Sequence, residues 1–402
     1  MIPFSPPRID QKVIDEVTAA LKSGWITTGP RTKLFENKIT EYCGCKTTVA
    51  VNSWTTGVQI LLNWYGIKEG DEVILPAYTY CATANVIIHA RAQPVMVDIN
   101  KDDFNISIDA IRKAITKKTK AIITVDLGGF PCDYDKINAL VNEKEIKEQF
   151  NPNTSLQKKL GRILIISDGA HSFGAIMDKK RSGSLTDISA FSFHAVKNLT
   201  TAEGGALCFN LPNQFNHEEI YTKFCTMILH GQNKDALAKT QKGNWRYDVE
   251  EPGFKGNMTD IQAAIGLVEL ERYQENLERR KKIFELYNAA FKMQTWAIIP
   301  MHITEKKISS FHLYQLRING ITENIRDKII QEIFNQGVSV NVHFLPLPTL
   351  TAYKNLGFKI TDFPETWKNY QNEISLPVYF NLTDQNVELV INAVILSVKK
   401  FI

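Results

Sequence analysis

The sequence predicts an α/β fold, in which a large domain with a seven-stranded, mostly parallel sheet precedes a smaller C-terminal α+β domain. Three observations predict it. Short segments rich in β-branched residues recur through the first half of the chain, helix-like segments separate several of them, and the pattern changes near residue 254. Alternation of this kind is typical of parallel strands joined by helices.

Seven short segments are expected to form the strands of the large sheet. They lie at 47–52, 72–76, 93–99, 121–126, 164–168, 187–193 and 205–210. The polar segment 141–160 contains Asn-Pro-Asn and is expected to be a helix end followed by a surface loop. Because ligands of such sheets bind beyond the carboxyl ends of the strands, the residues that follow each strand are the candidates for function.

The second half begins with a helix signal. Thr259 followed by Gln262 three residues later forms a capping box, and it predicts a long helix over about 260–291. Strands are expected near 311–318 and 338–344, and Thr383 starts a final helix. We therefore expect a large domain at 1–253 and, at 254–402, a linking helix with a small domain.

Composition excludes several classes of protein. The chain has 402 residues and a net charge of +4, which is too small and too dispersed to indicate nucleic-acid binding. Its six cysteines lack zinc-ligand spacing, so we expect reduced thiols and no metal site. The start, MIPFSPPRID, lacks the features of a signal peptide, and no apolar run approaches the ~18 residues of a membrane span. A cytoplasmic protein is expected.

The segment DISAFSFHAVKNLTTAEGG, at 187–205, contains the densest group of reactive side chains. Side chains alternate along a strand, so Phe191 and Phe193 would face one way, and Ser192 and His194 the other. Lys197 follows at a turn. Partial burial would lower the pKa of its amine and make it a usable nucleophile. From these residues alone, a surface lysine in a loop is the alternative interpretation.

Asp168 ends the strand of LIISDGAHSFGA, where α/β enzymes place functional groups. Its carboxylate could hold a cationic ring nitrogen or a metal, or it could cap a helix. His171 lies three residues further on and could equally be a hydrogen-bonded core histidine. A metal site lacks a clear third ligand.

The segment VNSWTTGVQILLNWYG, at 51–66, predicts a strand end followed by a helix start that carries hydroxyl groups. Free backbone N–H groups at a helix start form a natural phosphate site, with Thr55 and Thr56 beside it. Simple capping of the helix by Thr55 is the alternative. The segment is neither a Walker loop nor a dinucleotide fingerprint.

Two tyrosines follow the second strand, in PAYTYCATAN at 76–85. Tyr78 and Tyr80 would lie on the ligand side of the sheet, where either could stack on an aromatic ring. A tyrosine packed into a loop is the alternative for each.

Taken together, these segments resemble the nucleotide-sugar aminotransferases of the DegT/StrS type, which are pyridoxal-phosphate (PLP) enzymes of fold type I. The resemblance covers nearly the whole chain. It is carried by GWITTGP at 24–30, VNSWTTGVQILL at 51–62, GDEVILPAYTYCATAN at 70–85, KTKAIITVDLGGFPCDYD at 118–135, DGAHSFGA at 168–175, FSFHAVKNLTTAEGG at 191–205, PGFKGNMTDIQAAIG at 252–266 and FHLYQLRI at 311–318. FSFHAVKN is the most specific of these.

The resemblance implies a role for each candidate residue. Lys197 would bind the cofactor covalently, Asp168 would hold the pyridine nitrogen, and Tyr80 would stack on the ring. The remaining positions are implied to contact the phosphate (Thr55, Thr56, Ser192 and, from the neighbouring subunit, Asn257), the phenolic oxygen (His171), the pocket wall (His194) and the sugar nucleotide (Thr28).

The resemblance also implies a reaction and an assembly. An amino group, with glutamate as the expected donor, would pass to a nucleotide-linked keto-sugar such as a 4-keto-6-deoxyhexose, for surface polysaccharide or deoxysugar synthesis. A 3-keto-sugar is an open alternative. A homodimer with shared sites is implied by Asn257.

A PLP-dependent sugar dehydratase and a non-catalytic regulator are the alternative functions on the same fold. Dehydratases of this family have histidine at the position of Lys197, and intact Lys197, Asp168 and Ser192 also argue against a non-catalytic regulator. The chain departs from the family at Trp54, where many members have a small residue. The bulky ring would either reshape the pocket or turn away from it.

Overall fold

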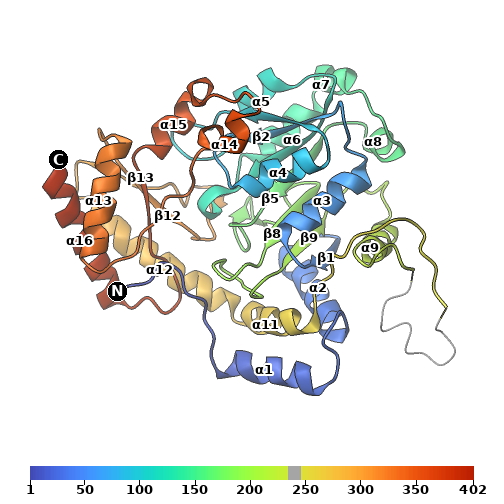
Figure 1. Cartoon of the computed structure of the whole chain (residues 1–402), viewed down its shortest axis with the longest axis horizontal. Coiled ribbons are helices and arrows are strands. Elements are labelled where there is room, and N and C mark those ends of the chain that lie inside the picture. The colour runs from blue at the N-terminus through green and yellow to red at the C-terminus, as the bar shows by residue number, and fades with distance from the viewer. Residues whose placement is uncertain (234–245) are drawn as a thin grey trace.

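The computed structural model describes residues 1–233 and 246–402. Its centre is a seven-stranded sheet in the order β1-β9-β8-β5-β4-β2-β3 (Figure 1). Strand β9 runs antiparallel to both of its neighbours, β1 and β8, and the pairs from β8 to β3 are parallel. The predicted α/β fold with a mostly parallel sheet is confirmed.

All seven predicted segments form strands of this sheet, and no strand end differs from its prediction by more than two residues. They are β1 Thr47–Val51, β2 Glu72–Pro76, β3 Gln93–Val97, β4 Thr119–Val125, β5 Leu164–Asp168, β8 Ile188–Ser192 and β9 Gly205–Phe209. The helices of this half are α1 Gln11–Lys22, α2 Pro30–Cys43, α3 Trp54–Tyr65, α4 Cys81–His89, α5 Ile108–Ala114, α6 Tyr134–Asn142, α7 Lys144–Gln149, α8 Ser155–Leu160 and α9 His217–Met227.

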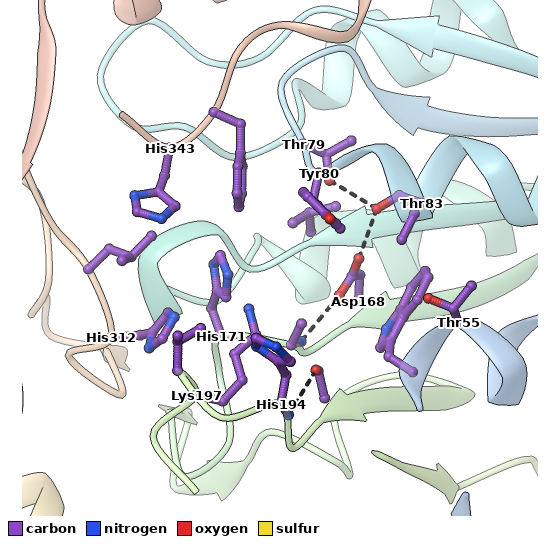
Figure 2. A pocket seen from close by; sticks show the side chains of 18 of the residues that line it. Thr55, Thr79, Tyr80, Thr83, Asp168, His171, His194, Lys197, His312 and His343 are labelled. Atoms are coloured by element: carbon purple, nitrogen blue, oxygen red, sulfur yellow. Dashed lines mark hydrogen bonds between the residues drawn. The ribbon is translucent and has the colours of Figure 1, made fainter. Parts of the chain in front are cut away.

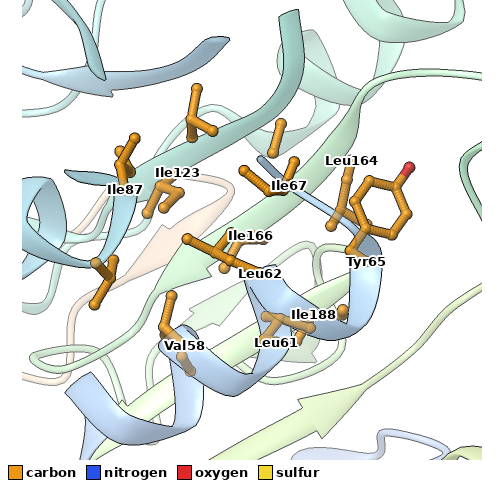
Figure 3. Packing of buried hydrophobic residues seen from close by; sticks show 14 of the residues in the cluster. Val58, Leu61, Leu62, Tyr65, Ile67, Ile87, Ile123, Leu164, Ile166 and Ile188 are labelled. Carbon is orange, nitrogen blue, oxygen red and sulfur yellow. The ribbon is translucent and has the colours of Figure 1, made fainter. Parts of the chain in front are cut away.

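Apolar side chains on both faces of the sheet bury it between helices. Strand β4 shows the alternation: Ile123 packs toward α3 and α4, and Ile122 packs on the other face toward α5 and α6. Figure 3 shows the first of these cores, where Leu62 lies beside Ile166 and Ile87 lies beside Ile123. This packing fixes the strand ends on which the site is built.

The second half follows the prediction in part. Thr259 and Gln262 form the predicted capping box, but the expected single helix is interrupted at Arg272, whose backbone leaves the helical region (φ −104°, ψ 14°). The result is α11 Asp260–Glu271 and α12 Tyr273–Phe291. Thr383 caps the final helix, α16 Asp384–Phe401, as predicted.

One predicted strand of the second half is wrong. Segment 338–344 makes only isolated bridges at Val338 and Asn341. The small sheet instead contains β10 Ala297–Ile298, β12 Tyr314–Ile318 and β13 Glu373–Leu376. The other elements are β6 Ile176–Met177, β7 Lys180–Arg181, β11 Lys307–Ile308, α13 Glu323–Asn335, α14 Thr351–Lys354, α15 Pro364–Tyr370 and the short 3₁₀ turns Leu127–Gly129, Leu347–Thr349 and Ile360–Asp362.

The polar segment 141–160 is more ordered than predicted. Two short helices, α7 and α8, fill most of it, and Thr154 caps the second by accepting the backbone N–H of Gln157. A separate apolar core joins α12, α13 and α16 to the small sheet. The predicted domain boundary between residues 253 and 254 stays a prediction. Across 1–233 and 246–402, no helix combines the length and apolarity needed to cross a bilayer.

Candidate active site

A cavity of about 340 Å³ lies beyond the carboxyl ends of β5 and β8. The N-terminal end of α3 and the loop after β2 form one side of it, and His312 and His343 reach it from the second half of the chain (Figure 2). Pockets of ~300–1,000 Å³ suit small organic ligands and cofactors. Seven of the predicted site residues line it: Thr55, Tyr80, Asp168, His171, Ser192, His194 and Lys197.

Lys197 enters this cavity from the turn that follows β8. Its backbone N–H donates to the carbonyl of His194 at 2.9 Å, which closes the turn. Burial lowers the pKa of its amine to about 8, against the opposing effect of the Asp168 carboxylate. The alternation predicted for β8 also holds, because Phe191 and Phe193 are fully buried in a core while Ser192 and His194 line the cavity.

Asp168 is the last residue of β5 and is almost wholly buried. Its carboxylate accepts the hydroxyl of Thr83 at 2.9 Å and the backbone N–H of Ala170 at 3.2 Å. Burial raises its pKa to about 6, although both hydrogen bonds and Lys197 act in the opposite direction. An ionised, buried carboxylate of this kind requires a cationic partner, which a protonated ring nitrogen would supply.

The N-terminal end of α3 is capped by Ser53, which accepts the backbone N–H of Thr56 at 3.1 Å. Capping by Thr55, the alternative considered from the sequence, is therefore wrong, and Thr55 lines the cavity instead. Gly205, the first residue of β9, allows the backbone of β9 to lie close to the start of α3, since a Cβ there would lie 2.7 Å from the backbone nitrogen of Trp54. The helix end, Thr55 and Ser192 together suit a phosphate group.

Trp54 neither leaves the pocket nor points to solvent. Its side chain is 5% exposed, belongs to the main core and also lines the cavity. Its indole nitrogen is buried and has no hydrogen-bond partner among the described residues. The ring therefore forms part of the pocket wall.

The two tyrosines after β2 differ in their surroundings. Tyr78 is fully buried and stacks on Phe104 with ring centroids 5.4 Å apart, so it is a core residue. Tyr80 is 59% exposed, lines the cavity and lies 5.6 Å from the ring of Phe344. Only Tyr80 presents a ring against which a flat ligand could stack.

Four histidines line the cavity with Lys197, and two of them, His312 and His343, were missed from the sequence (Figure 2). The ring of His171 lies 4.4 Å from that of His312. Burial holds the pKa of both well below the ordinary value, so both are neutral. His171 Nδ1 accepts the backbone N–H of Gly128 at 3.3 Å, which leaves its proton on Nε2.

Three predicted residues do not line the cavity. Thr56 is held by Ser53 at the helix cap. Asn257 donates its side-chain N–H to the hydroxyl of Thr28 at 2.7 Å, and both are buried away from the cavity of their own chain. Within one chain, therefore, Thr28 and Asn257 form a separate pair.

The residues present fit PLP. Asp168 would provide a buried anion for the pyridine nitrogen, and the start of α3 with Thr55 and Ser192 would provide donors for the phosphate. Lys197 lies in the same cavity with a lowered amine pKa, as a covalently binding lysine requires.

Comparison with known proteins agrees with this geometry. The structure of Spr1654 from Streptococcus pneumoniae, assigned as a sugar aminotransferase and solved in a PMP form, matches with a TM-score of 0.96 and 45% identity over 100% of both chains. PseC from Helicobacter pylori, an aminotransferase involved in pseudoaminic acid biosynthesis, matches with a TM-score of 0.86 and 26% identity, again over 100% of both chains.

A curated relative agrees as well. The spore coat polysaccharide biosynthesis protein SpsC from Bacillus subtilis is 36% identical over 399 residues, which is 98% of this chain and 96% of SpsC. The family model of the DegT/DnrJ/EryC1/StrS aminotransferases matches residues 7–148 and 154–395. The family resemblance found in the sequence is confirmed, and the chain belongs to the DegT/DnrJ/EryC1/StrS aminotransferase family.

Proposed function

We propose that this protein is a PLP-dependent aminotransferase that moves an amino group from glutamate to a nucleotide-linked keto-deoxysugar. The observation that carries the proposal is the convergence of Lys197 and Asp168, from two strand ends, in one cavity with a helix N-terminus. Each of the three matches a different part of the cofactor.

PLP, when bound, supplies an electron-accepting ring that stabilises the negative charge left on a substrate carbon after a proton leaves. Asp168 would keep the ring nitrogen protonated, and Tyr80 would cover one ring face. His171 Nε2–H would donate to the phenolic oxygen. The pocket thereby orients the ring and fixes its charge.

Lys197 would both hold the cofactor and move the proton. Its burial lowers the pKa of the amine to about 8, so a useful fraction is unprotonated near neutral pH. Once displaced by an incoming amine, the free Nζ can take a proton from one carbon and deliver it to another. Two half-reactions over the same residue predict ping-pong kinetics.

A panel of sugar substrates tests which nucleotide-linked keto-sugar accepts the amino group. The purified enzyme, incubated with glutamate and dTDP-, UDP- or GDP-linked 4-keto- and 3-keto-sugars, is expected to convert one sugar class into an amino-sugar with release of 2-oxoglutarate. Mass spectrometry of the sugar and enzymatic assay of 2-oxoglutarate measure it. Failure of every keto-sugar, with a loaded cofactor, would contradict the proposed acceptor class.

Surface polysaccharide synthesis is the proposed context. It is supported by the resemblance to SpsC, a spore coat polysaccharide biosynthesis protein, and to PseC, an aminotransferase involved in pseudoaminic acid biosynthesis. The predicted cytoplasmic location fits activated sugars as substrates.

We further propose a homodimer with shared sites, in which Asn257 reaches the phosphate in the partner's cavity. The pairing of Asn257 with Thr28, outside the cavity of their own chain, supports this arrangement. Thr28 would then lie near the sugar nucleotide of the neighbouring site.

Mixed dimers test the shared site. Asn257→Ala and Lys197→Ala proteins are each expected to have little activity, and dissociation and reassociation of a 1:1 mixture should restore roughly a quarter of the intact sites, because half of the dimers are mixed and each has one complete site. Differently tagged subunits verify that mixed dimers form. Mixed dimers without recovered activity would show that each site is built from one chain.

A further inference from the structure

A chain of hydrogen bonds leads from the cavity into the small sheet. His343, on the cavity wall, shares a 2.9 Å hydrogen bond between its Nδ1 and the hydroxyl of Ser375. Ser375 in turn lies 2.5 Å from a carboxylate oxygen of Glu373. The other carboxylate oxygen of Glu373 accepts the backbone N–H of His343 at 3.1 Å. The three residues are therefore linked twice.

The fold places these side chains with little freedom. Glu373 and Ser375 are two residues apart in β13 and so face the same side of the strand. Both are fully buried. The side-chain amide of Gln315, on β12, donates to the backbone carbonyl of His343 at 3.0 Å. The ring of Phe4 stacks on the imidazole of His343. The imidazole is thus held with Nδ1 toward Ser375, which leaves Nε2 for the cavity (Figure 2).

Glu373 lies among charged and titratable groups from three other elements. Arg326 of α13 and Arg317 of β12 act to lower the pKa of Glu373, as do its two hydrogen bonds. Burial raises the pKa of the nearby Tyr78, and the charge of Glu373 adds to that effect. Arg326 donates to the backbone carbonyl of Tyr370 at 2.8 Å rather than to this carboxylate. Burial outweighs these effects and raises the pKa of Glu373 to about 8.

The hydrogen bonds allow two arrangements of protons, because a serine hydroxyl has one proton to donate. With Glu373 ionised, Ser375 donates to Glu373 and accepts from His343 Nδ1–H, so Nε2 presents a lone pair to the cavity. With Glu373 protonated, Glu373 donates to Ser375, Ser375 donates to Nδ1, and Nε2 carries a proton. The heavy atoms need not move.

We propose that His343, Ser375 and Glu373 form a proton relay, through which His343 Nε2 takes a proton from the ammonium group of the amino-acid donor while Glu373 receives one. This inference rests on the proposed transaminase function for its substrate. His343 would be the catalytic residue of the relay, and Ser375 and Glu373 would be positioning residues that act through it.

The step is balanced in atoms and charge. An N–H bond of the ammonium breaks as Nε2–H forms, the Nδ1 proton passes to Ser375, and the Ser375 proton passes to Glu373. A cation and a buried carboxylate become a neutral amine and a neutral acid, so no charge is left uncompensated in the pocket. Free α-amino groups are mostly protonated near neutral pH, and only the neutral amine is a nucleophile.

The relay also avoids an imidazolium. Burial and the nearby Lys197 amine lower the pKa of His343 to about 3, so His343 alone is a poor proton acceptor near neutral pH. Glu373, with its pKa raised to about 8, is matched to the task. Because ionised Glu373 is the competent form, the relay accepts protons more readily as the pH rises through about 8.

Nitrogen NMR of the holoenzyme tests the relay directly. In protein with ¹⁵N-labelled histidine, the His343 signal is identified by its loss in His343→Gln. The proton of its ring is expected on Nε2 below about pH 8 and on Nδ1 above it. In Glu373→Gln, whose amide always donates to Ser375, it should stay on Nε2, and Ser375→Ala should abolish the change. A single tautomer in the native protein, or an unchanged switch in Glu373→Gln, would overturn the relay.

Stopped-flow reaction of the loaded enzyme with glutamate provides the functional test. Glu373→Gln should react about 10²-fold more slowly above pH 8 and lose the inflection due to Glu373. Glu332→Gln is the matched control, because Glu332 is a carboxylate of α13 that pairs with Lys400. This variant should behave like the native enzyme. Unfolding temperature and visible cofactor absorption verify that each variant is folded and loaded.

A wrong amino-group donor and a wrong proton relay would give different experimental results. If glutamate is not a donor, the cofactor spectrum stays unchanged in every protein, while the NMR switch of His343 persists. If the relay is wrong, the native enzyme and Glu373→Gln convert with the same rate and the same pH profile.

Discussion

Lys197→Ala is expected to lower transaminase activity by at least about 10⁴-fold, because in the proposed mechanism one side chain is both nucleophile and proton carrier. The visible absorption of the covalently held cofactor should also disappear, even where some cofactor remains bound through Asp168 and the start of α3. Single-turnover reaction with glutamate, followed by absorbance, measures both effects.

Lys180→Ala is the matched control for this change. Lys180 lies exposed on β7, away from the cavity, so its loss should change neither activity nor absorption. Added methylamine should restore part of the lost rate to Lys197→Ala, since a small free amine can carry a proton in the vacated space. A Lys197→Ala protein with the full native rate would refute the assigned mechanism.

Asp168→Asn is expected to lower the rate by about 10²–10³-fold, the scale seen when one preorganised electrostatic partner is removed. The amide keeps the shape of the side chain and its contact with Thr83, but it cannot hold a protonated ring nitrogen. The cofactor should also dissociate more readily. Spectroscopic titration of the apoenzyme with PLP, together with single-turnover rates, measures these effects.

The same residue predicts a pH dependence of cofactor binding. The pKa of Asp168 is raised to about 6, so the anionic form is present above that pH and is lost as the pH falls through it. PLP affinity of the native apoenzyme should therefore fall below about pH 6, and Asp168→Asn should lack this decline. Asp135→Asn, at an exposed carboxylate in the first turn of α6, should retain it. Parallel curves for native and Asp168→Asn proteins would argue against the role of Asp168.

The large sheet was predictable because its strands are buried on both faces. Continuous apolar segments such as LIISD and AIITV are typical of central parallel strands, which are buried on both faces. Asp168 is the last residue of its segment, so its place at a strand end follows from the sequence. Lys197 was different: its local sequence was compatible with a surface loop, and the placement of Ser192 and Asp168 around the same cavity is what sets it apart.

The residues missed from the sequence come from distant parts of the chain. His312 and His343 reach the cavity because loops of the second half of the chain pack against the strand ends of the large sheet, and no local pattern reports that contact. Segment 338–344 has strand-like composition, yet Asn341 and Ser375 make only a short bridge there. His312 did lie in the motif FHLYQLRI, so its position was available without its role.

Helix starts were ambiguous for a local reason. Ser53 and Thr55 are both good caps, and only the three-dimensional structure shows which hydroxyl accepts the backbone N–H of Thr56. The choice matters, since the hydroxyl not used for capping, that of Thr55, lines the cavity.

We propose that Lys197 binds PLP covalently. Borohydride reduction of the purified enzyme, followed by proteolysis and mass spectrometry, tests it most directly. We expect loss of the visible absorption and a pyridoxyl-phosphate adduct on the peptide that contains Lys197, in the segment FSFHAVKN. An adduct on a different lysine, or a fully active enzyme in which Lys197 remains unmodified after reduction, would contradict it.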